Sequence, residues 1–548
     1  MRNLSWRAMV GVLLAFAVLW FGTLEQRRLI NPDEGRYAEI PREMVATGDW
    51  LTPRLNGFKY FEKPALHYWA TAAAFSVFGE HHWTARLWSA LTGFLGVLIT
   101  AFAAWRLAGP AAAAIAAAVL GGGMLWNVIG HVNTLDMGVS FFLAAAVFAL
   151  CLANRDGCSE RESRRWRDGS WALLALAVLS KGLIGLVLPA ATVVVYTLWQ
   201  RDWGFILRIR PLRGVLILLA ITAPWFIAVS LANPEFAHFF FIHEHFERFL
   251  TKAHGRYQPA WYFVPILLIG MLPWLTALAP GLVRGWRLQP GKRFQPERFL
   301  LVWIVLVFVF FSASSSKLAS YILPIFPAWA LLIGRYLAES PQAIRWQAAF
   351  ATVVGIGALC LTPWVTRFAN TEVPLELYLN YQPWLYAGGG LLAASGVAAW
   401  ILAGRGRGVA AVLTMAFGGF ALGQGFLLGH DALGKVNSAH DIAATIRPQL
   451  PKDAPFFNVD TYDQSLQFYL KRTTTMVAYR DELGFGIAQE PHKFIPDIAG
   501  FEQAWAAAPV AWAMMSPKTW LAMHAQGLPM VEVVRDTRRV IVKKPAKN

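Results

Sequence analysis

The chain has 548 residues, of which 56% are hydrophobic and 15% charged, and its mean hydropathy is +0.43. A soluble protein of this length needs far more polar surface, so the composition excludes that class and favours a polytopic membrane protein. Lysine and arginine outnumber aspartate and glutamate by 49 to 33, which gives a net charge of +16. Because this excess is gathered in a few loops, we interpret it as a topology signal and expect no binding to nucleic acid.

Long apolar stretches recur along most of the chain. One helical crossing of a bilayer needs about 20 apolar residues. Stretches of this kind lie at 8–24, 87–105, 110–130, 137–153, 182–200, 214–232, 259–283, 299–316, 318–334, 346–366, 384–404 and 408–428. With a shorter stretch at 170–180, they predict about 13 transmembrane helices. No small-residue cleavage site follows the first stretch, so we expect it to be retained as a helix.

Arginine and lysine are concentrated in four of the connecting loops, around 155–167, 201–213, 284–298 and 405–407. The positive-inside rule makes such loops cytoplasmic. With the N-terminus also inside, the segments expected outside are 25–82, 131–136, 233–258, 367–383 and the region after 429. The acidic residues of interest therefore fall on one face of the membrane.

The chain divides into a transmembrane domain, 1–428, and a region after it with a different pattern. The first external loop, 25–82, is too long for a turn, and its helical apolar spacing at 34–46 and 60–78 indicates helices lying at the interface. In 429–548 the apolar runs shorten. Strands are expected at 456–460, 474–479, 510–515, 530–534 and 540–542, and helices around 463–471 and 518–526. This pattern predicts a small external α/β domain.

Two adjacent carboxylates, Asp33 and Glu34, follow Pro32 where the first apolar stretch ends. Charges this close to lipid usually either stabilise a helix end or take part in chemistry. Proline favours the start of a helix, whose dipole one acidic residue would complement. However, Arg36 and further charges crowd the same short segment, so the cluster could equally bind an ionic headgroup.

Lys63 lies in an aromatic setting further along the same loop. It is either a snorkelling lysine or a phosphate ligand, with Tyr60 adding a hydroxyl donor. The polar break at 131–136 contains Asp136, which either caps a helix or supplies a second carboxylate on the same face. Lys317 and Tyr321 lie in another break; they mark a simple topological break or close the floor of a lipid-phosphate pocket.

The segment 243–248 combines histidine, glutamate and arginine on an external loop. In an α-helix, His243 and Glu247 share a face, and with Glu62 from the first loop they could bind a divalent cation such as zinc. The spacing matches no strong zinc signature, so a salt-bridged surface helix is the alternative. Arg248 could instead contact phosphate through its planar guanidinium.

The runs Asn31-Pro32-Asp33-Glu34-Gly35-Arg36-Tyr37 and Phe61-Glu62-Lys63-Pro64-Ala65-Leu66-His67-Tyr68-Trp69 resemble those of the lipid A aminoarabinose transferases. The break Ser180-Lys181-Gly182 and the run from Lys317 to Pro324 fit the same family, and the resemblance covers about residues 1–335. This family belongs to the GT-C membrane glycosyltransferases and is related to the protein O-mannosyltransferases.

The resemblance implies an α-helical GT-C fold in the bacterial inner membrane, with the active site and C-terminal domain in the periplasm. It implies transfer of 4-amino-4-deoxy-L-arabinose from undecaprenyl phosphate to a lipid A phosphate, with inversion, and hence resistance to polymyxin and other cationic antimicrobial peptides. No cofactor is expected to be required, although the periplasmic site could hold a divalent metal such as zinc. The expected partners are the aminoarabinosyl lipid, lipid A and membrane lipids, and the protein is expected to be a monomer.

Carried onto this chain, the resemblance makes Asp33 the leading catalytic carboxylate. The other residues that we assign to the site are Asp136 and Glu34 as supporting carboxylates, Lys63, Tyr60, Arg36, Arg248, Tyr321 and Lys317 as substrate or phosphate ligands, and Glu62 and His243 as metal ligands. An acceptor phosphate oxygen is already anionic near neutral pH, so a strong base is barely required. We therefore expect Asp33 to orient charged partners, such as the ammonium of the amino sugar, more than to take a proton.

Two other functions fit parts of the pattern. A protein O-mannosyltransferase shares the architecture but moves a neutral sugar to Ser or Thr, whose hydroxyl does need a base. A lipid flippase would line a pathway with buried charge, and its charges should then face a cavity open to both sides of the membrane. The charges of this chain are instead expected to cluster on one side.

Overall fold

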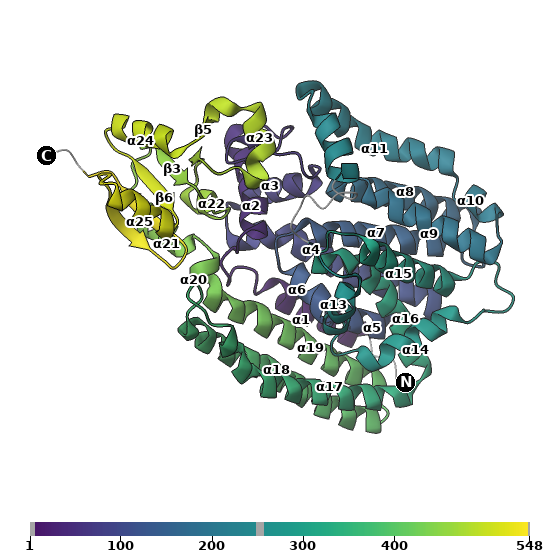
Figure 1. Ribbon diagram of the computed structural model, residues 1–548. Helices are drawn as coiled ribbons and strands as arrows, with labels where there is room; N and C mark the ends of the chain where they lie inside the picture. Colours follow the sequence, from purple (N-terminus) through teal and green to yellow (C-terminus); the bar gives the residue numbers. More distant parts are fainter. Residues whose placement is uncertain (1–5, 248–256, 546–548) are drawn as a thin grey trace.

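The structure is a computed structural model that describes residues 6–247 and 257–545 (Figure 1). Most of it is a bundle of long helices, and a smaller α/β domain lies at one end, on the left in Figure 1. The two parts correspond to the predicted transmembrane and C-terminal domains. The predicted fold class, a helical membrane protein with a small α/β domain, is therefore confirmed.

The bundle is built from apolar helices, several of which begin at a proline, as expected for the first helical position. Its helices are α1 (Trp6–Phe21), α4 (His82–Ala108), α5 (Pro110–Gly121), α6 (Met124–Gly130), α7 (Leu135–Ala153), α8 (Glu160–Lys181), α9 (Ile184–Gln200), α10 (Gly204–Arg208), α11 (Pro211–Ala232), the π-helical η1 (His238–Glu247), α13 (Phe263–Gly270), α14 (Leu278–Trp286), α15 (Pro296–Ala313), α16 (Phe326–Glu339), α17 (Pro341–Leu361), α18 (Leu375–Gly404) and α19 (Gly408–His430). Helix α7 is the most deeply buried of the long apolar helices, so it forms the centre of the bundle.

Within the described residues, 8 helices are long and apolar enough to cross a membrane. The number rises to 10 if the bent pairs α5–α6 and α13–α14 each count as one crossing. The first pair bends by 64° at Gly122 and Gly123. Gly122 packs directly on α19, because a Cβ there would lie 2.6 Å from the Cα of Ala416. Every predicted apolar stretch coincides mainly with helix, but the count of thirteen crossings stays a prediction.

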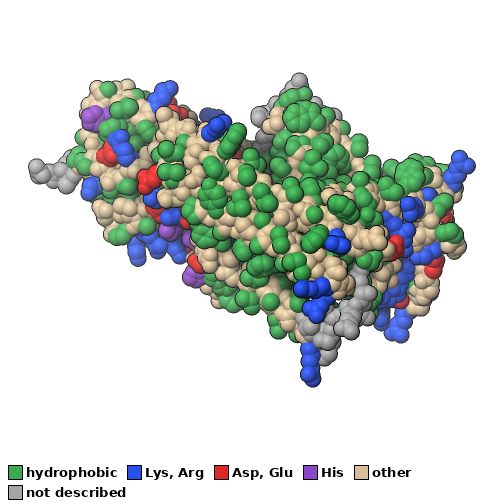
Figure 2. All heavy atoms as spheres, turned by 90° about the horizontal axis from the view of Figure 1, so that it is seen from below, with side chains coloured by type: hydrophobic (Ala, Val, Ile, Leu, Met, Phe, Trp, Pro, Cys, Tyr) green, Lys and Arg blue, Asp and Glu red, His purple; other side chains and the backbone are tan. Residues whose placement is uncertain are grey.

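The charged loops lie at the two ends of the bundle. Ion pairs join three of the Arg-rich loops, with Arg210 2.7 Å from Glu160 and Arg293 3.9 Å from Asp202. Helix α10 and the chain from α14 to α15 lie at this Arg-rich end, on the right in Figure 1. Figure 2 shows hydrophobic side chains over the middle of the bundle and many Lys and Arg at its right-hand end. The first loop and the C-terminal domain lie at the opposite end.

The first loop contains the predicted helix at 34–46 as α2 (Asp33–Thr47), then a hairpin of β1 (Arg54–Leu55) and β2 (Phe58–Lys59), and α3 (Leu66–Phe78). Residues 60–65, predicted to be helical, are not in a helix. The interfacial placement of α2 is also wrong, since every residue from Glu34 to Met44 is buried. Protein covers α2 on all sides, because α3 and the C-terminal domain pack on it.

The C-terminal domain contains one mixed sheet of order β5-β4-β3-β6-β8-β7. The five predicted strands are present as β3 (Phe456–Val459), β4 (Thr475–Val477), β6 (Trp512–Met515), β7 (Val531–Arg535) and β8 (Val540–Lys543), and the two predicted helices as α22 (Leu466–Leu470) and α25 (Pro517–Ala525). The prediction missed strand β5 (Phe494–Ile495). It also missed four helices, α20 (Gly434–Asn437), α21 (His440–Ile446), α23 (Gly484–Gln489) and α24 (Ile498–Ala507). Strands β5, β4, β3 and β6 run parallel, whereas β8 and β7 are antiparallel to their neighbours.

The C-terminal domain holds the chain that leads into α2. The backbone N–H of Leu29 donates to the Tyr469 hydroxyl at 2.8 Å, and the Asn31 amide donates to Asp463 at 2.5 Å. At Gly35 a Cβ would lie 2.6 Å from the backbone nitrogen of Ser465. Only glycine permits this close approach. The two segments are more than 400 residues apart in sequence and form one packed unit.

Candidate functional site

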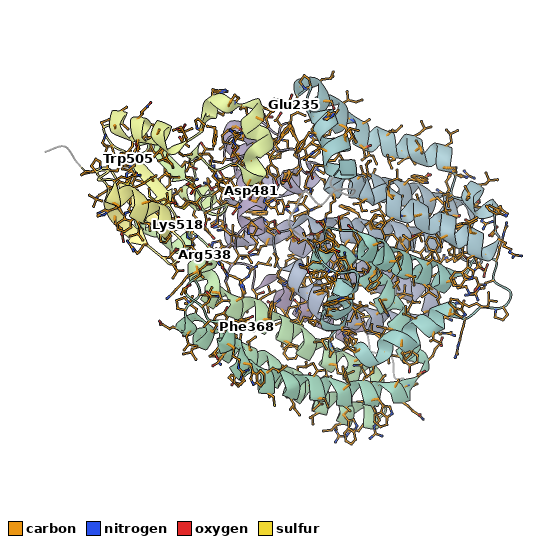
Figure 3. All side chains as sticks on the ribbon, viewed as in Figure 1. Glu235, Phe368, Asp481, Trp505, Lys518 and Arg538 are labelled. Carbon is orange, nitrogen blue, oxygen red and sulfur yellow. The ribbon has the colours of Figure 1, made fainter. Side chains whose placement is uncertain are left out.

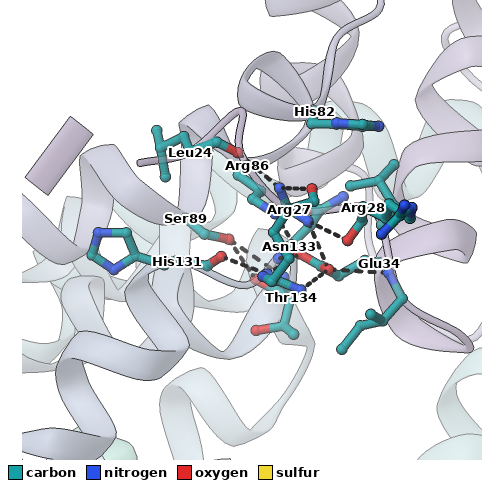
Figure 4. Close-up of polar contacts among 12 residues, drawn as sticks. Leu24, Arg27, Arg28, Glu34, His82, Arg86, Ser89, His131, Asn133 and Thr134 are labelled. Carbon is teal, nitrogen blue, oxygen red and sulfur yellow. Dashed lines mark hydrogen bonds and ion pairs between the residues drawn. The ribbon is translucent and has the colours of Figure 1, made fainter. Parts of the chain in front are cut away.

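Glu34 lies at the centre of a buried ionic network (Figure 4). Its carboxylate is 0% exposed and binds two guanidiniums, those of Arg27 at 2.7 Å and Arg86 at 2.7 Å. It also accepts the backbone N–H of Asn133 at 3.0 Å. Arg86 in turn donates to the backbone carbonyls of residues 24, 27 and 28. The network therefore ties together the end of α1, the start of α2, helix α4 and the 131–136 break.

These contacts assign Glu34 a structural role. Burial alone would raise the pKa of Glu34, but the two guanidiniums outweigh it and hold that pKa well below its usual range. The carboxylate is thus ionised and fully surrounded by protein donors. The prediction that Glu34 takes part in catalysis is therefore corrected, because no face of this carboxylate is open to a substrate.

Asp33, one residue earlier, has the opposite environment. Its side chain is 42% exposed, and its carboxylate lies 3.4 Å from Arg36. The Arg36 guanidinium donates to the Tyr60 hydroxyl at 3.0 Å and lies 3.0 Å from Glu482 of the C-terminal domain. Arg36 is buried, so its orientation is fixed by these partners. The predicted residues Asp33, Arg36 and Tyr60 thus come together, with an accessible carboxylate at the edge of the cluster.

The 131–136 break is joined to the first loop through His67. The ring Nε2 lies 3.0 Å from the side-chain oxygen of Asn133. Burial lowers the pKa of His67 to about 4, so the ring is neutral at physiological pH and donates from Nε2 to this oxygen. This bond holds the turn before Asp136 against α3.

Asp136 lies at the start of α7 and binds side chains from two other helices. It forms an ion pair with Lys181, at the end of α8, and accepts the Ser320 hydroxyl at 2.9 Å. The Lys181 ammonium also lies over the ring of Tyr321, 4.6 Å from its centre. The predicted residues Asp136 and Tyr321 are therefore neighbours, joined by Lys181, which was not among the predicted site residues.

Lys63 lies between two carboxylates. Its ammonium is 3.3 Å from Glu244 and 3.9 Å from Glu62, and its side chain is 17% exposed. His243 stacks on Phe239, with ring centres 5.2 Å apart. Glu62 thus faces an ammonium, and the described residues contain no group of three or more His, Cys, Asp or Glu placed to hold a metal. The metal site expected at Glu62 and His243 therefore stays a prediction, and we derive no step through a metal.

Lys317 does not join this cluster. The Lys317 ammonium donates to the backbone carbonyls of Gln258 and Ser314, and its side chain is 4% exposed. It closes a turn between spans, so its predicted place at the floor of a phosphate pocket is corrected. Arg248 lies outside the described residues. The segment before it is π-helical, so the α-helical spacing expected for His243 and Glu247 does not apply.

Glu43 is 4% exposed on α2 and accepts the Gly57 N–H at 2.9 Å. Burial, together with the neighbouring Glu39, raises the pKa of Glu43 to about 8. A raised pKa in the folded state stabilises the protein at low pH, and this contribution is lost as the pH rises from the unfolded value towards 8. Glu43→Gln should remove that loss. Between pH 5 and pH 8, the free energy of unfolding of the variant should therefore rise relative to that of the wild type, by up to about 1.4 kcal/mol per pH unit. A difference in melting temperature between the two proteins that stays constant across this pH range would contradict the raised pKa of Glu43.

Residues 442–544 match the family described as aminoarabinose transferase C-terminal domain, and residues 62–227 match dolichyl-phosphate-mannose-protein mannosyltransferase. The crystal structure of ArnT from Cupriavidus metallidurans bound to undecaprenyl phosphate is similar to this chain over 99% of each chain, with 37% identity and a TM-score of 0.95. Its apo form gives 38% identity, 98% coverage of each chain and a TM-score of 0.93. The chain is therefore a glycosyltransferase that uses a lipid-linked sugar.

Curated relatives identify the family more closely. The undecaprenyl phosphate-alpha-4-amino-4-deoxy-L-arabinose arabinosyl transferase 1 of Sodalis glossinidius is 35% identical over 386 residues, which is 67% of each chain. The corresponding protein 1 of Proteus mirabilis is 35% identical over 68% of this chain and 69% of its own. The chain belongs to this family of arabinosyl transferases. The oligosaccharyltransferase of Archaeoglobus fulgidus, at 13% identity and a TM-score of 0.51, shares the fold.

Proposed function

We propose that this protein transfers 4-amino-4-deoxy-L-arabinose from undecaprenyl phosphate to a phosphate of lipid A in the bacterial inner membrane. The observation that carries the proposal is the similarity over 99% of each chain to an arabinosyl transferase crystallised with undecaprenyl phosphate. The gathering of Arg36 and Tyr60 beside the accessible carboxylate of Asp33 supports it. Modification of lipid A by a cationic sugar would lower its negative charge, which accounts for resistance to polymyxin and other cationic antimicrobial peptides.

The proposed orientation follows from charge. The Arg-rich end faces the cytoplasm by the positive-inside rule, so the opposite end, with Asp33 and the C-terminal domain, faces the periplasm. Both substrates are lipids, and their headgroups lie at the membrane surface. A site at the outer end of the bundle, next to the first loop, suits two such headgroups.

In the proposed reaction, an anionic oxygen of the lipid A phosphate forms a bond to the anomeric carbon of the donor. The bond from that carbon to the carrier phosphate breaks, and its electron pair leaves with undecaprenyl phosphate. Attack from the opposite face inverts the configuration. No proton needs to be removed from the acceptor, so the chain's main task is to stabilise negative charge on the leaving phosphate and to orient both lipids.

The site residues fit these tasks as follows. Asp33 is placed to hold the ammonium of the amino sugar, since its carboxylate is accessible and next to a fixed arginine. Lys63, Arg36, Tyr60 and Arg248 are proposed to bind the carrier phosphate, with Lys63 supplying an ammonium and Tyr60 a hydroxyl. Lys181, held by Asp136 and lying over Tyr321, adds a second ammonium from the bundle.

The proposal is tested by mass spectrometry of lipid A from cells with and without the gene. We expect an aminoarabinose mass increment only in cells that contain the gene. Purified protein should reproduce the increment with the aminoarabinosyl lipid and lipid A, and should give no product with a mannosyl lipid and a Ser/Thr peptide. Product in the second reaction would favour the O-mannosyltransferase alternative, and no product in either would favour the flippase.

A further inference from the structure

A pocket of about 250 Å³ lies between the first loop and the C-terminal domain, and two of its lining residues directly precede Asp33 in the sequence. Its walls include Asn31, Pro32, Tyr462, Gln464, Arg538 and Arg539. Gln464 also donates to Glu482 at 2.5 Å, and Glu482 pairs with Arg36. The Glu482 side chain therefore lies between Gln464 in the pocket wall and Arg36 in the cluster around Asp33.

Two of the residues that line the pocket carry a buried polar atom with no hydrogen-bond partner among the described residues. The Tyr462 hydroxyl and the side-chain oxygen of Asn31 are buried and, within the described part of the chain, accept and donate no hydrogen bond. Tyr462 is 8% exposed overall. Unpaired polar groups of this kind are costly unless something binds them. Their chemistry, one hydroxyl and one amide oxygen, suits the hydroxyls of a sugar.

The two arginines of the pocket differ in availability. Arg539 is buried and binds Asp463 at 2.6 Å and Asp536 at 2.7 Å, so its charge is compensated. Arg538 is 42% exposed and is 3.2 Å from Glu372, which is itself 60% exposed. An ion pair this open to solvent contributes little. A phosphate can therefore displace Glu372 and take the Arg538 guanidinium in a bidentate contact.

The mouth of the pocket lies next to the end of an apolar helix, where a membrane boundary is expected. Thr537, next to Arg538, donates to the backbone carbonyl of Glu372 at 2.6 Å. The loop of Glu372 follows η5 (Thr362–Phe368), where Trp364 is 55% and Phe368 69% exposed. Exposed aromatic residues at the end of a transmembrane helix are typical of the lipid headgroup level. Figure 3 shows Arg538 and Phe368 on the same side, where the C-terminal domain meets the end of α18.

We propose that this pocket binds the phosphorylated sugar headgroup of the acceptor lipid, with Arg538 on a phosphate and with Tyr462 and Asn31 on sugar hydroxyls. The inference rests on the proposed function, because it assigns the acceptor a place next to Asp33. A lipid that reaches the outer end of α17 and α18 would pass Arg538 first and then present its headgroup to Pro32 and Asp33. The C-terminal domain is thus part of the substrate site.

The test compares Arg538→Gln with Arg535→Gln in the full-length protein. Arg535 is the matched control, because it is 46% exposed on the same hairpin and pairs with Glu532, away from the pocket. Arg538→Gln should raise the KM for lipid A about tenfold, the loss expected for one charged contact, and leave the KM for the donor lipid unchanged. Arg535→Gln should change neither. Tyr462→Phe, which keeps the ring, should also raise only the KM for lipid A.

Binding is measured separately, without donor, using nanodiscs that contain lipid A or phosphatidylglycerol. Arg538→Gln should weaken binding of lipid A and leave that of phosphatidylglycerol unchanged. An equal loss of binding for both lipids would mean that Arg538 attracts any anionic headgroup. Equal binding of lipid A by Arg538→Gln and by the control Arg535→Gln would exclude the pocket. Either result overturns the inference. If wild-type protein forms no aminoarabinosyl lipid A, the proposed function fails, whereas normal transfer with an unchanged KM in Arg538→Gln refutes the pocket alone.

Discussion

Asp33→Asn should lower kcat/KM for aminoarabinose transfer by about a hundredfold or more, with little change in thermal stability. The side chain is 42% exposed and contributes one contact to Arg36 at 3.4 Å, so its removal leaves the fold intact. The expected loss reflects the charge of Asp33, which holds the ammonium of the amino sugar in the reacting position. Asp453→Asn, at an exposed carboxylate of the C-terminal domain, is the control and should retain full activity.

A donor whose amino group is acetylated separates the two roles of Asp33. If Asp33 binds the ammonium, the acetylated donor should react slowly with the wild type and equally slowly with Asp33→Asn. If Asp33 takes a proton instead, the variant should lose the same factor with both donors. Full activity of Asp33→Asn with the natural donor would exclude both roles.

Glu34→Gln should destabilise the protein by about 3–5 kcal/mol, because it leaves the buried guanidiniums of Arg27 and Arg86 without a counter-charge. The expected result is a large fall in folded yield and melting temperature in detergent. Glu532→Gln breaks an exposed pair with Arg535 and is the matched control, with an expected cost below about 1 kcal/mol. A melting temperature for Glu34→Gln as high as that of the control would contradict the structural role.

The difference in stability between the wild type and Glu34→Gln has a defined pH dependence. Since the pKa of Glu34 is held below its usual range, its contribution is fully present above the unfolded-state pKa and is lost only as the pH falls through the lowered value. The stability gap between wild type and Glu34→Gln should therefore be constant from pH 5.5 to pH 8. This contrasts with Glu43→Gln, whose gap changes over the same range.

The fold was predictable to the extent that it depends on local patterns. Apolar length predicted the helices, and alternating short apolar runs predicted five of the six strands of the C-terminal sheet. Strand β5 was missed because its two residues, Phe494 and Ile495, are too few to form a pattern. The placement of α2 was wrong for a different reason: its charged residues are paired inside the protein, so its composition is that of a surface helix although it is buried.

The site was predictable only where its residues are close in sequence or belong to a recognisable run. Asp33, Arg36 and Tyr60 share one loop, and they meet. Glu482 and Lys181 were not found, because their partners Arg36 and Asp136 are distant in sequence and a single charge carries no signal of what it contacts. For Glu34, the deciding partner is Arg86, one arginine on a helix 52 residues away. Its unusual position at the outer end of an apolar helix was the available signal.

The contact of Gly35 with Gln464 and Ser465 has a consequence for biosynthesis. The first loop leaves the ribosome early, but the segment that packs on it is made only when synthesis is nearly complete. Until then α2 carries buried charges and an uncovered surface, so the loop and the C-terminal domain must reach their final form together. The first loop can therefore reach its final packing only after residues 464 and 465 have been made and have folded against Gly35.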